Sequence, residues 1–306
     1  MLRERTNFAQ QLISDESEFF FFMLVCTTIP QIRSALQAHY PTKSIGLVPT
    51  MGALHEGHLS LIRASKQEND LTVCSIFVNP TQFNNPEDLL KYPRVLAQDL
   101  EMLEEVGCDY VFAPEETEMY PQPLSLGIDF GDLERTLEGT HRPGHFKGVG
   151  VVVAKLFNII LPQRAYFGQK DLQQYLIISQ LVSQLNFNIQ LKSCPIIREK
   201  DGLAMSSRNR RLNEAERQIA PKIYEALKLA ENALKNHASV ESAKKTALQL
   251  LNDFSVLEVE YLEIVGAENL VPLPPSMKVE EFGKPIAVCT AVKLGDIRLI
   301  DNILIP

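Results

Sequence analysis

The sequence predicts an α/β fold, with a Rossmann-like, doubly wound parallel sheet followed by a smaller C-terminal α+β domain. Three observations support this prediction. Short apolar runs rich in Val and Ile alternate with helix-like segments between residues 29 and 194. The first complete run ends at a glycine-containing turn that leads into a helix. Beyond residue 195 the pattern changes to an amphipathic helical region and a final pair of strands.

The larger domain begins with a predicted helix over residues 29–38 and a buried strand over residues 44–48. A helix that starts near His58 and a strand over residues 71–78 complete a strand, helix, strand unit. The elements that follow are a helix over 99–106, a strand over 110–112, a helix over 149–160, a strand over 165–167, a helix over 172–185 and a strand over 189–194. This alternation predicts a parallel sheet that is covered by helices on both faces.

The smaller domain is predicted to open with a capping box, because Asn213 is followed three residues later by Glu216. This cap predicts one long amphipathic helix, whose apolar face includes Ile223, Leu227 and Leu234. Strands over 286–294 and 297–304, joined by Gly295 and Asp296, predict an antiparallel hairpin. We therefore expect two domains, over residues 23–194 and 195–306, the second acting as a lid.

Residues 1–22 are predicted to be an N-terminal appendage that is not part of the fold, with Met23 a plausible true start. The segment is polar apart from four consecutive phenylalanines, and acidic residues directly precede that run. A signal peptide has the opposite arrangement, with a basic start and a longer apolar region. The aromatic run is also far too short to span a bilayer.

Composition excludes several classes of function. The chain has 306 residues, of which 45% are hydrophobic and 22% charged, as expected for a globular protein without disulfides. Its net charge of -8 disfavours binding to nucleic acid or to an anionic membrane. Five cysteines without a CxxC pair favour reduced thiols and argue against a zinc site, so we expect a cytoplasmic protein.

The segment from Pro49 to His58 has the position of a ligand site, because it joins the first strand of the unit to its helix. Gly52 and Gly57 allow the backbone to approach a phosphate closely. The helix N-terminus offers free N–H groups, and His55 and His58 add imidazole donors. The turn therefore predicts a phosphate-binding site.

Two other interpretations of the histidine pair are weaker. A metalloprotease motif places its two histidines four residues apart on one helix, whereas His55 and His58 are three apart. A purely structural interpretation has one histidine capping the helix and the other packing in the core. The turn also lacks the GxGxxG pattern of dinucleotide-binding folds and the GxxxxGK[ST] pattern of P-loops.

His-x-Gly-His at this turn resembles the ATP signature of the nucleotidyltransferase superfamily, which includes class I aminoacyl-tRNA synthetases. Further motifs, in order along nearly all of the chain from Met23, resemble the pantothenate synthetase family. They are Pro49–His58, Phe77–Pro80 with Gln82 and Phe83, Tyr92–Arg94, Leu137–Gly139, Arg142–Phe146, Phe167–Asp171 with Gln173 and Gln174, Asp201–Asn209, and Leu299–Asn302.

The resemblance implies a ligase that makes pantothenate in two steps. The carboxylate of pantoate attacks the α-phosphate of ATP and releases pyrophosphate, and β-alanine then attacks the pantoyl adenylate and releases AMP. It also implies Mg²⁺ as the companion of ATP, and a homodimer. Two alternatives remain open, a nucleotidylyltransferase of the same superfamily and a catalytically silent ATP-binding or tRNA-associated module. The silent module would be marked by loss of a histidine or of the Ser-Arg loop, and both are present.

The resemblance also implies a set of site residues, with His58 as proton donor to the reacting phosphate. The implied catalytic residues are His55, His58, Lys170, Ser206 and Arg208. The implied ATP-binding residues are Met51, Gly52, Ala53, Leu54, His55, Glu56, Gly57, His58, Gly168, Gln169, Lys170, Asp171, Ile197, Met205, Ser206, Ser207 and Arg208. Pantoate is assigned to Gln82, Gln174 and Asn79, β-alanine to Gln82, and the metal to Asp99.

Some residues are candidates on less specific grounds. Met51 and Phe83 are expected to supply apolar wall for the dimethyl group of pantoate. Arg142 and His145 are expected to attract anionic substrates. Ala53 and Gln98 depart from the family pattern, which has an Asn at the first position and in some members an acidic residue at the second.

Overall fold

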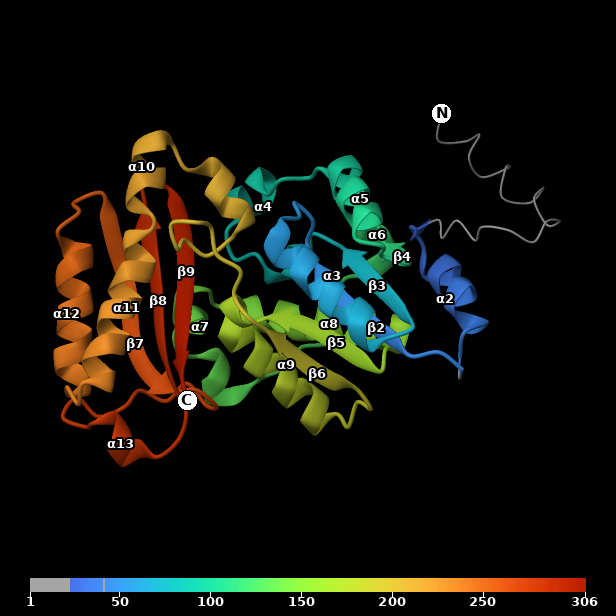
Figure 1. Ribbon diagram of the computed structural model, residues 1–306. Helices are drawn as coiled ribbons and strands as arrows, with labels where there is room; N and C mark the ends of the chain where they lie inside the picture. Colours follow the sequence, from blue (N-terminus) through green and yellow to red (C-terminus); the bar gives the residue numbers. More distant parts are fainter. Residues whose placement is uncertain (1–22, 41) are drawn as a thin grey trace.

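The computed structural model describes residues 23–40 and 42–306. The predicted appendage, residues 1–22, lies outside the described residues. Figure 1 shows a large sheet flanked by helices and, beside it, a small sheet covered by two long helices. Within the described residues, no helix is long and apolar enough to cross a membrane.

The large sheet has six parallel strands in the order β1-β4-β3-β2-β5-β6. Their bounds are β1 Leu24–Cys26, β2 Ile45–Thr50, β3 Leu71–Ile76, β4 Tyr110–Phe112, β5 Arg164–Gly168 and β6 Gln190–Cys194. From β2 the chain builds the sheet outward through β3 and β4, then returns to the other side of β2 for β5 and β6. The Rossmann-like prediction is confirmed, and the strand order reverses between β2 and β5.

Helices cover both faces of this sheet, as predicted. The longer ones are α2 Ile29–Gln37, α3 Glu56–Glu68, α5 Leu96–Glu105, α8 His145–Ile160 and α9 Leu172–Gln184. Shorter helical segments are η1 Pro80–Gln82, α4 Pro86–Lys91, α6 Glu116–Met119, η2 Gly131–Glu134, α7 Glu138–His141 and η3 Gln169–Asp171. Successive strand residues point to opposite faces, so Leu47 packs in the core with α2, α8 and α9, whereas Val48 packs in the core with α3 and α5.

The small sheet is antiparallel, in the order β7-β8-β9, with bounds β7 Leu257–Gly266, β8 Ile286–Leu294 and β9 Ile297–Ile305. The predicted hairpin is confirmed, because Leu294 pairs with Ile297 across the turn at Gly295. Helices α11 Lys222–Lys235 and α12 Val240–Asn252 share a buried apolar core with this sheet. The remaining segments are η4 Ser207–Arg211, α10 Glu214–Ile219 and α13 Val279–Phe282. The predicted division at residue 195 directly follows the last strand of the large sheet, and its position stays a prediction.

The prediction of one long helix from Asn213 was wrong. The capping box forms as expected, with Asn213 Oδ1 accepting from Glu216 N and Glu216 Oε2 accepting from Asn213 N, each at 2.9 Å. The helix α10 ends at Ile219, however, and α11 begins at Lys222. Pro221 lies between them, and its ring nitrogen has no hydrogen to continue the helical ladder.

Candidate active site

The loop from β2 to α3 has an unusual backbone conformation that is stabilised by hydrogen bonds to a neighbouring helix. Gly52 and Ala53 both lie in the left-handed region, with φ of +78° and +50°, and the second of these is unusual for a residue with a side chain. Asp99, which is 1% exposed on α5, accepts hydrogen bonds from Ala53 N at 2.9 Å and Leu54 N at 2.7 Å. The carboxylate therefore holds the loop from beneath.

The two histidines lie together at the start of α3. Their ring centroids are 4.0 Å apart, and the backbone N–H of His55 donates to Nδ1 of His58 over 3.3 Å. This bond places the proton of a neutral His58 on Nε2. Nδ1 of His55 is buried and has no hydrogen-bond partner among the described residues.

Burial keeps both imidazoles neutral at pH 7. It lowers the pKa of His55 to about 2, with the neighbouring His58 and Lys170 adding to the effect. Burial also lowers the pKa of His58 to about 4, and the positive charge of Lys170 contributes. Both rings therefore act as neutral hydrogen-bonding groups in the ligand-free protein.

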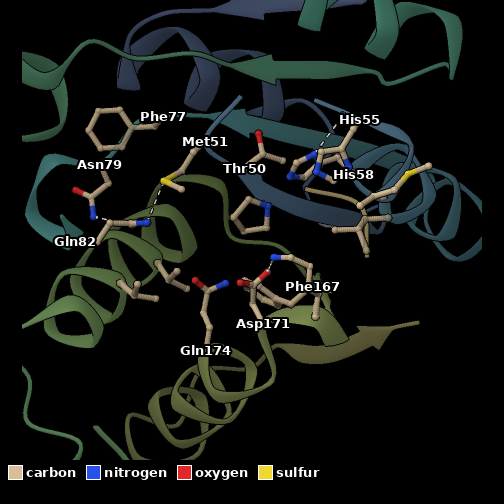
Figure 2. A pocket seen from close by; sticks show the side chains of 18 of the residues that line it. Thr50, Met51, His55, His58, Phe77, Asn79, Gln82, Phe167, Asp171 and Gln174 are labelled. Atoms are coloured by element: carbon tan, nitrogen blue, oxygen red, sulfur yellow. Dashed lines mark hydrogen bonds and ion pairs between the residues drawn. The ribbon is translucent and has the colours of Figure 1, made fainter. Parts of the chain in front are cut away.

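A cavity of about 190 Å³ lies at the point where the strand order reverses, and we call it the switch-point cavity. Figure 2 shows His55 and His58 on one side of this cavity, Asn79 and Gln82 on another, and Asp171 and Gln174 opposite. Its apolar wall includes Met51, Leu61, Phe77, Val149, Val152, Val153, Leu156 and Phe167. Phe83 is not part of the wall; its ring packs against Tyr92 with centroids 5.8 Å apart. Polar groups thus surround a partly apolar pocket, as in sites for small polar ligands.

Four amide side chains lie in or next to the switch-point cavity. Gln82 is 7% exposed and donates from Nε2 to the sulfur of Met51, while its Oε1 accepts from Asn79 Nδ2 at 3.1 Å. Gln174 lines the cavity from α9. Its neighbour Gln173 points elsewhere, because its amide is bonded to the backbone of η2 and α7. Of the two adjacent glutamines, Gln174 is therefore the one available to a ligand.

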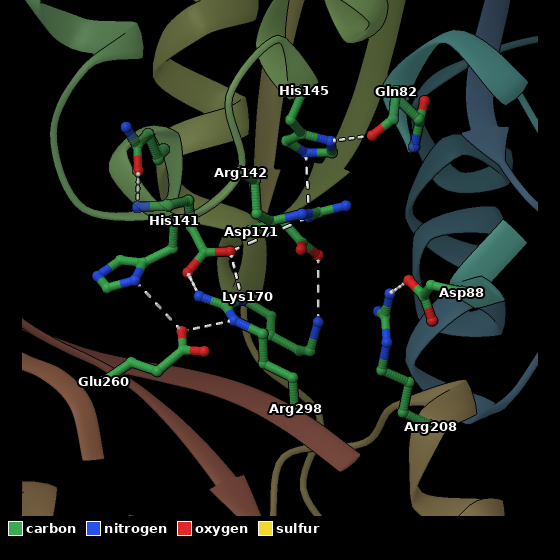
Figure 3. Close-up of polar contacts among 12 residues, drawn as sticks. Gln82, Asp88, His141, Arg142, His145, Lys170, Asp171, Arg208, Glu260 and Arg298 are labelled. Atoms are coloured by element: carbon green, nitrogen blue, oxygen red, sulfur yellow. Dashed lines mark hydrogen bonds and ion pairs between the residues drawn. The ribbon is translucent and has the colours of Figure 1, made fainter. Parts of the chain in front are cut away.

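A second cavity of about 520 Å³ adjoins the first and shares Lys170 and Asp171 with it. We call it the charged cavity, because seven Lys and Arg and seven Asp and Glu side chains line it. Figure 3 shows how these charges pair: Arg208 contacts Asp88 at 3.0 Å, and Lys170 contacts Asp171 at 3.4 Å. The cavity therefore holds its cations in ion pairs.

The structure brings most of the predicted nucleotide residues to these two cavities. The switch-point cavity is lined by Met51, His55, Gly57, His58, Gly168, Lys170, Asp171, Ile197 and Met205, and the charged cavity by Lys170, Asp171, Ser206 and Arg208. Neither lining includes Gly52, Ala53, Leu54, Glu56, Gln169, Ser207 or Asp99. Asp99 uses both carboxylate oxygens on loop amides, and among the described residues no group of three or more His, Cys, Asp or Glu is arranged to hold a metal. Its assignment to a metal stays a prediction.

Arg142 and His145 form a link to the backbone of Gln82. His145 donates from Nδ1 to the carbonyl oxygen of Gln82 at 2.8 Å, and Arg142 donates to its Nε2 at 3.2 Å (Figure 3). Burial lowers the pKa of His145 to about 3, so the ring stays neutral and keeps this pattern. Arg142 lines the charged cavity, while His145 supports the segment that carries Gln82.

Several contacts near the site were not predicted from the sequence. Arg210 donates to the carbonyl oxygen of Leu54 at 3.1 Å and so joins the C-terminal region to the histidine loop. Arg298 on β9 makes two bonds of 2.7 Å to Glu138, which also accepts from the hydroxyl of Tyr261. The only available signal was the charge of these residues near motif positions, and charge alone does not identify a partner.

Comparison with known proteins agrees with this geometry. The sequence model of the family described as Pantoate-beta-alanine ligase matches residues 24–304. A pantothenate synthetase from Cytophaga hutchinsonii is 50% identical over 285 residues, covering 92% of this chain and 99% of the relative. One from Bacteroides thetaiotaomicron is 44% identical over 284 residues, covering 92% and 98%.

Solved structures give the same result. A pantothenate synthetase from Thermus thermophilus superposes with a TM-score of 0.86 at 40% identity, covering 92% of this chain and 99% of that one. Pantoate-beta-alanine ligase from Francisella tularensis, complexed with beta-gamma ATP and β-alanine, gives a TM-score of 0.77 at 37% identity, covering 92% and 98%. These matches favour the ligase over the alternative nucleotidylyltransferase and the silent ATP-binding module. The chain belongs to the pantoate-beta-alanine ligase family, the pantothenate synthetases, and is an enzyme.

Proposed function

We propose that this enzyme joins pantoate to β-alanine through a pantoyl adenylate, at the expense of ATP. In the first step a carboxylate oxygen of pantoate bonds to the α-phosphorus and the bond to the bridging oxygen breaks, releasing pyrophosphate. In the second step the amine nitrogen of β-alanine bonds to the acyl carbon, loses a proton, and AMP leaves. The observation that carries the proposal is the switch-point cavity, which is lined by two neutral imidazoles at a helix N-terminus together with Lys170, Gln82 and Gln174.

Phosphate chemistry suits the histidine side of the cavity. Negative charge spreads over the α-phosphoryl oxygens and the departing pyrophosphate, so fixed donors and a cation accelerate the step. His58 has Nε2–H as its donor, and the helix N-terminus adds a favourable dipole. Because its pKa is about 4, we assign His58 to hydrogen bonding and charge stabilisation rather than to proton transfer from the resting enzyme.

The opposite part of the cavity suits a small hydroxy acid. We assign the hydroxyl and carboxylate groups of pantoate to Gln82 and Gln174, with Asn79 holding Gln82 in place. The apolar wall that includes Val152 and Leu156 fits its dimethyl group. β-Alanine is assigned to Gln82 as well, and reaches the acyl carbon after pyrophosphate has left. We assign the charged cavity next to Lys170 as the route by which β-alanine enters and pyrophosphate leaves.

Magnesium is expected to arrive with ATP rather than to occupy a protein cage. Among the described residues no group of three or more His, Cys, Asp or Glu is arranged to hold a metal, and Mg²⁺ commonly binds substrate phosphates and waters with few protein ligands. When bound, it would neutralise charge on the phosphates. A homodimer and a cytoplasmic location are further parts of this proposal, supported by the family resemblance and by five unpaired cysteines.

The test is a product assay on the purified protein. Pyrophosphate release should require both ATP and pantoate, and AMP and pantothenate should accumulate only when β-alanine is added. His58→Ala should slow adenylate formation by about 100- to 1000-fold, the usual effect of removing one such donor. His237→Ala is the matched control, because that histidine pairs with Glu280 at the surface. Nucleotide transfer to a phosphorylated acceptor without pantoate, and without pantothenate, would overturn the proposal.

A further inference from the structure

Two adjacent polar residues on β9 are buried although they lie outside the catalytic set. Asp301 is 4% exposed and Asn302 is 3% exposed. Figure 1 shows β9 as the strand of the small sheet nearest to the large sheet. Buried polar side chains cost free energy unless they are fully hydrogen-bonded, so their partners indicate what they hold in place.

Asn302 holds the segment that carries Lys170. Its Nδ2 donates to the carbonyl oxygens of Gln169 and Lys170, each at 3.0 Å. Its Oδ1 accepts from Nε2 of Gln169 at 3.2 Å. The amide therefore uses both hydrogens and its oxygen on two consecutive residues of η3. A carboxylate in the same place could accept one bond but donate none.

Asp301 holds a second segment of the site through Arg198. The two side chains make bonds of 2.6 and 2.9 Å, and Arg198 also lies 3.8 Å above the ring of Tyr224. Arg198 directly follows Ile197, whose carbonyl oxygen accepts from Met205 N at 3.0 Å. Ile197 and Met205 both line the switch-point cavity. One dipeptide on the small sheet thus fixes the two chain segments that complete this cavity.

We propose that Asn302 is a positioning residue for adenylation, which acts by fixing the backbone from which Lys170 reaches the phosphates. The inference rests on the proposed function. The Lys170 side chain is long, and its one side-chain partner among the described residues is Asp171 at 3.4 Å, so its placement depends on its backbone. A displacement of about 1 Å at a reacting group can cost about 100-fold in rate. Asp301 and Arg198 give the same support to the segment with Met205.

The first experiment compares Asn302→Asp with the unmodified enzyme. Adenylate formation is measured as pantoate-dependent pyrophosphate release. We expect it to slow by about 10- to 100-fold. The KM for pantoate should not change, because the side-chain hydrogen bonds of Asn302 go to Gln169 and Lys170 rather than to Gln82 or Gln174. Leu304→Ala is the matched control, since that residue lies on the same strand and the same face and is 37% exposed. Gln169→Ala removes the hydrogen bond from Gln169 Nε2 to Asn302 Oδ1 without adding a charge. It should also slow adenylate formation, but by a smaller factor than Asn302→Asp.

The second experiment separates positioning from general structural support. If Asn302 acts through Lys170, the double variant Lys170→Ala with Asn302→Asp should be no slower than Lys170→Ala alone. The inference would be overturned if the rate reductions of the two single variants multiplied in the double variant. It would also be overturned if adenylation were unchanged in both Asn302→Asp and Gln169→Ala. Either result would leave the proposed function intact. An unmodified enzyme without pantoate-dependent pyrophosphate release would instead overturn the proposed function.

Discussion

Asp99 supports the histidine loop, and replacing it by asparagine tests whether that is its main role. The side chain is isosteric, but only one of its two terminal atoms can still accept a hydrogen bond. The other becomes an amide NH₂ group that faces a backbone N–H, because Ala53 N and Leu54 N approach one carboxylate oxygen each. Both of these loop residues are almost fully buried, so water cannot replace the lost acceptor.

The size of the effect follows from these two bonds. A hydrogen bond to a charged group contributes about 1.5–3 kcal/mol, so Asp99→Asn should lower the free energy of unfolding by about that amount. Asp99→Ala removes both acceptors and should cost about 3–6 kcal/mol. Without this support, the left-handed backbone at Ala53 can relax to a more ordinary conformation. We expect His55 to shift with it, so adenylation should slow as well.

Urea unfolding of the ligand-free enzyme without magnesium measures the stability change, and Glu101→Gln on the exposed face of α5 is the control. The magnesium dependence of pyrophosphate release is then measured for Asp99→Asn and for the control Glu101→Gln. Structural support predicts lost stability with an unchanged half-saturating concentration of Mg²⁺. Unchanged stability together with a raised magnesium requirement would refute this reasoning and identify Asp99 as the metal ligand.

Three further predictions concern other contacts of the site. Glu138→Gln should lower the free energy of unfolding by about 3 kcal/mol, measured in urea, because it weakens a buried pair with Arg298; unchanged stability would contradict this. Gly148→Ala should raise the KM for pantoate, because the new carbon would lie 2.3 Å from the carbonyl oxygen of Thr81 and must displace the segment that carries Gln82; a KM equal to that of the unmodified enzyme would count against this. The three site histidines have pKa values of about 2, 4 and 3 in the folded protein. In the unfolded chain they bind protons near pH 6.5, so stability in urea should fall below that pH, by up to about 1.4 kcal/mol per pH unit for each histidine. A flat profile between pH 6.5 and 4.5 would exclude these shifts.

Much of the fold could be predicted from the sequence because buried parallel strands appear as continuous apolar runs. Strand β2 illustrates this, with Leu47 and Val48 buried on opposite faces. Strand β1 was missed because it has three residues and lies at the sheet edge, where two of them are exposed. Strand β7 was also missed, although its alternation of apolar and acidic residues has the period of a half-exposed strand.

The candidate site could be predicted from the sequence where its residues lie within one segment. His55 and His58 occur in one turn, and the strand-to-helix position alone indicated a phosphate site. Contacts between distant segments could not be predicted in the same way. Arg210 and Leu54 are 156 positions apart, and nothing in either local pattern identifies the other as a partner. Such partners depend on the packing of the two sheets, which the local periodicity does not determine.

In the proposed function Arg208 binds the triphosphate of ATP, and its ion pair with Asp88 then predicts that nucleotide binding is an exchange of partners. In the ligand-free protein the guanidinium already has a carboxylate 3.0 Å away, and each side chain is only about a quarter exposed. An incoming anion must therefore compete with Asp88 for Arg208. A single small anion offers little more than the carboxylate that it replaces, whereas a triphosphate brings several charged oxygens at once. We therefore predict that Asp88 lowers the affinity of Arg208 for small monovalent anions more than its affinity for a triphosphate.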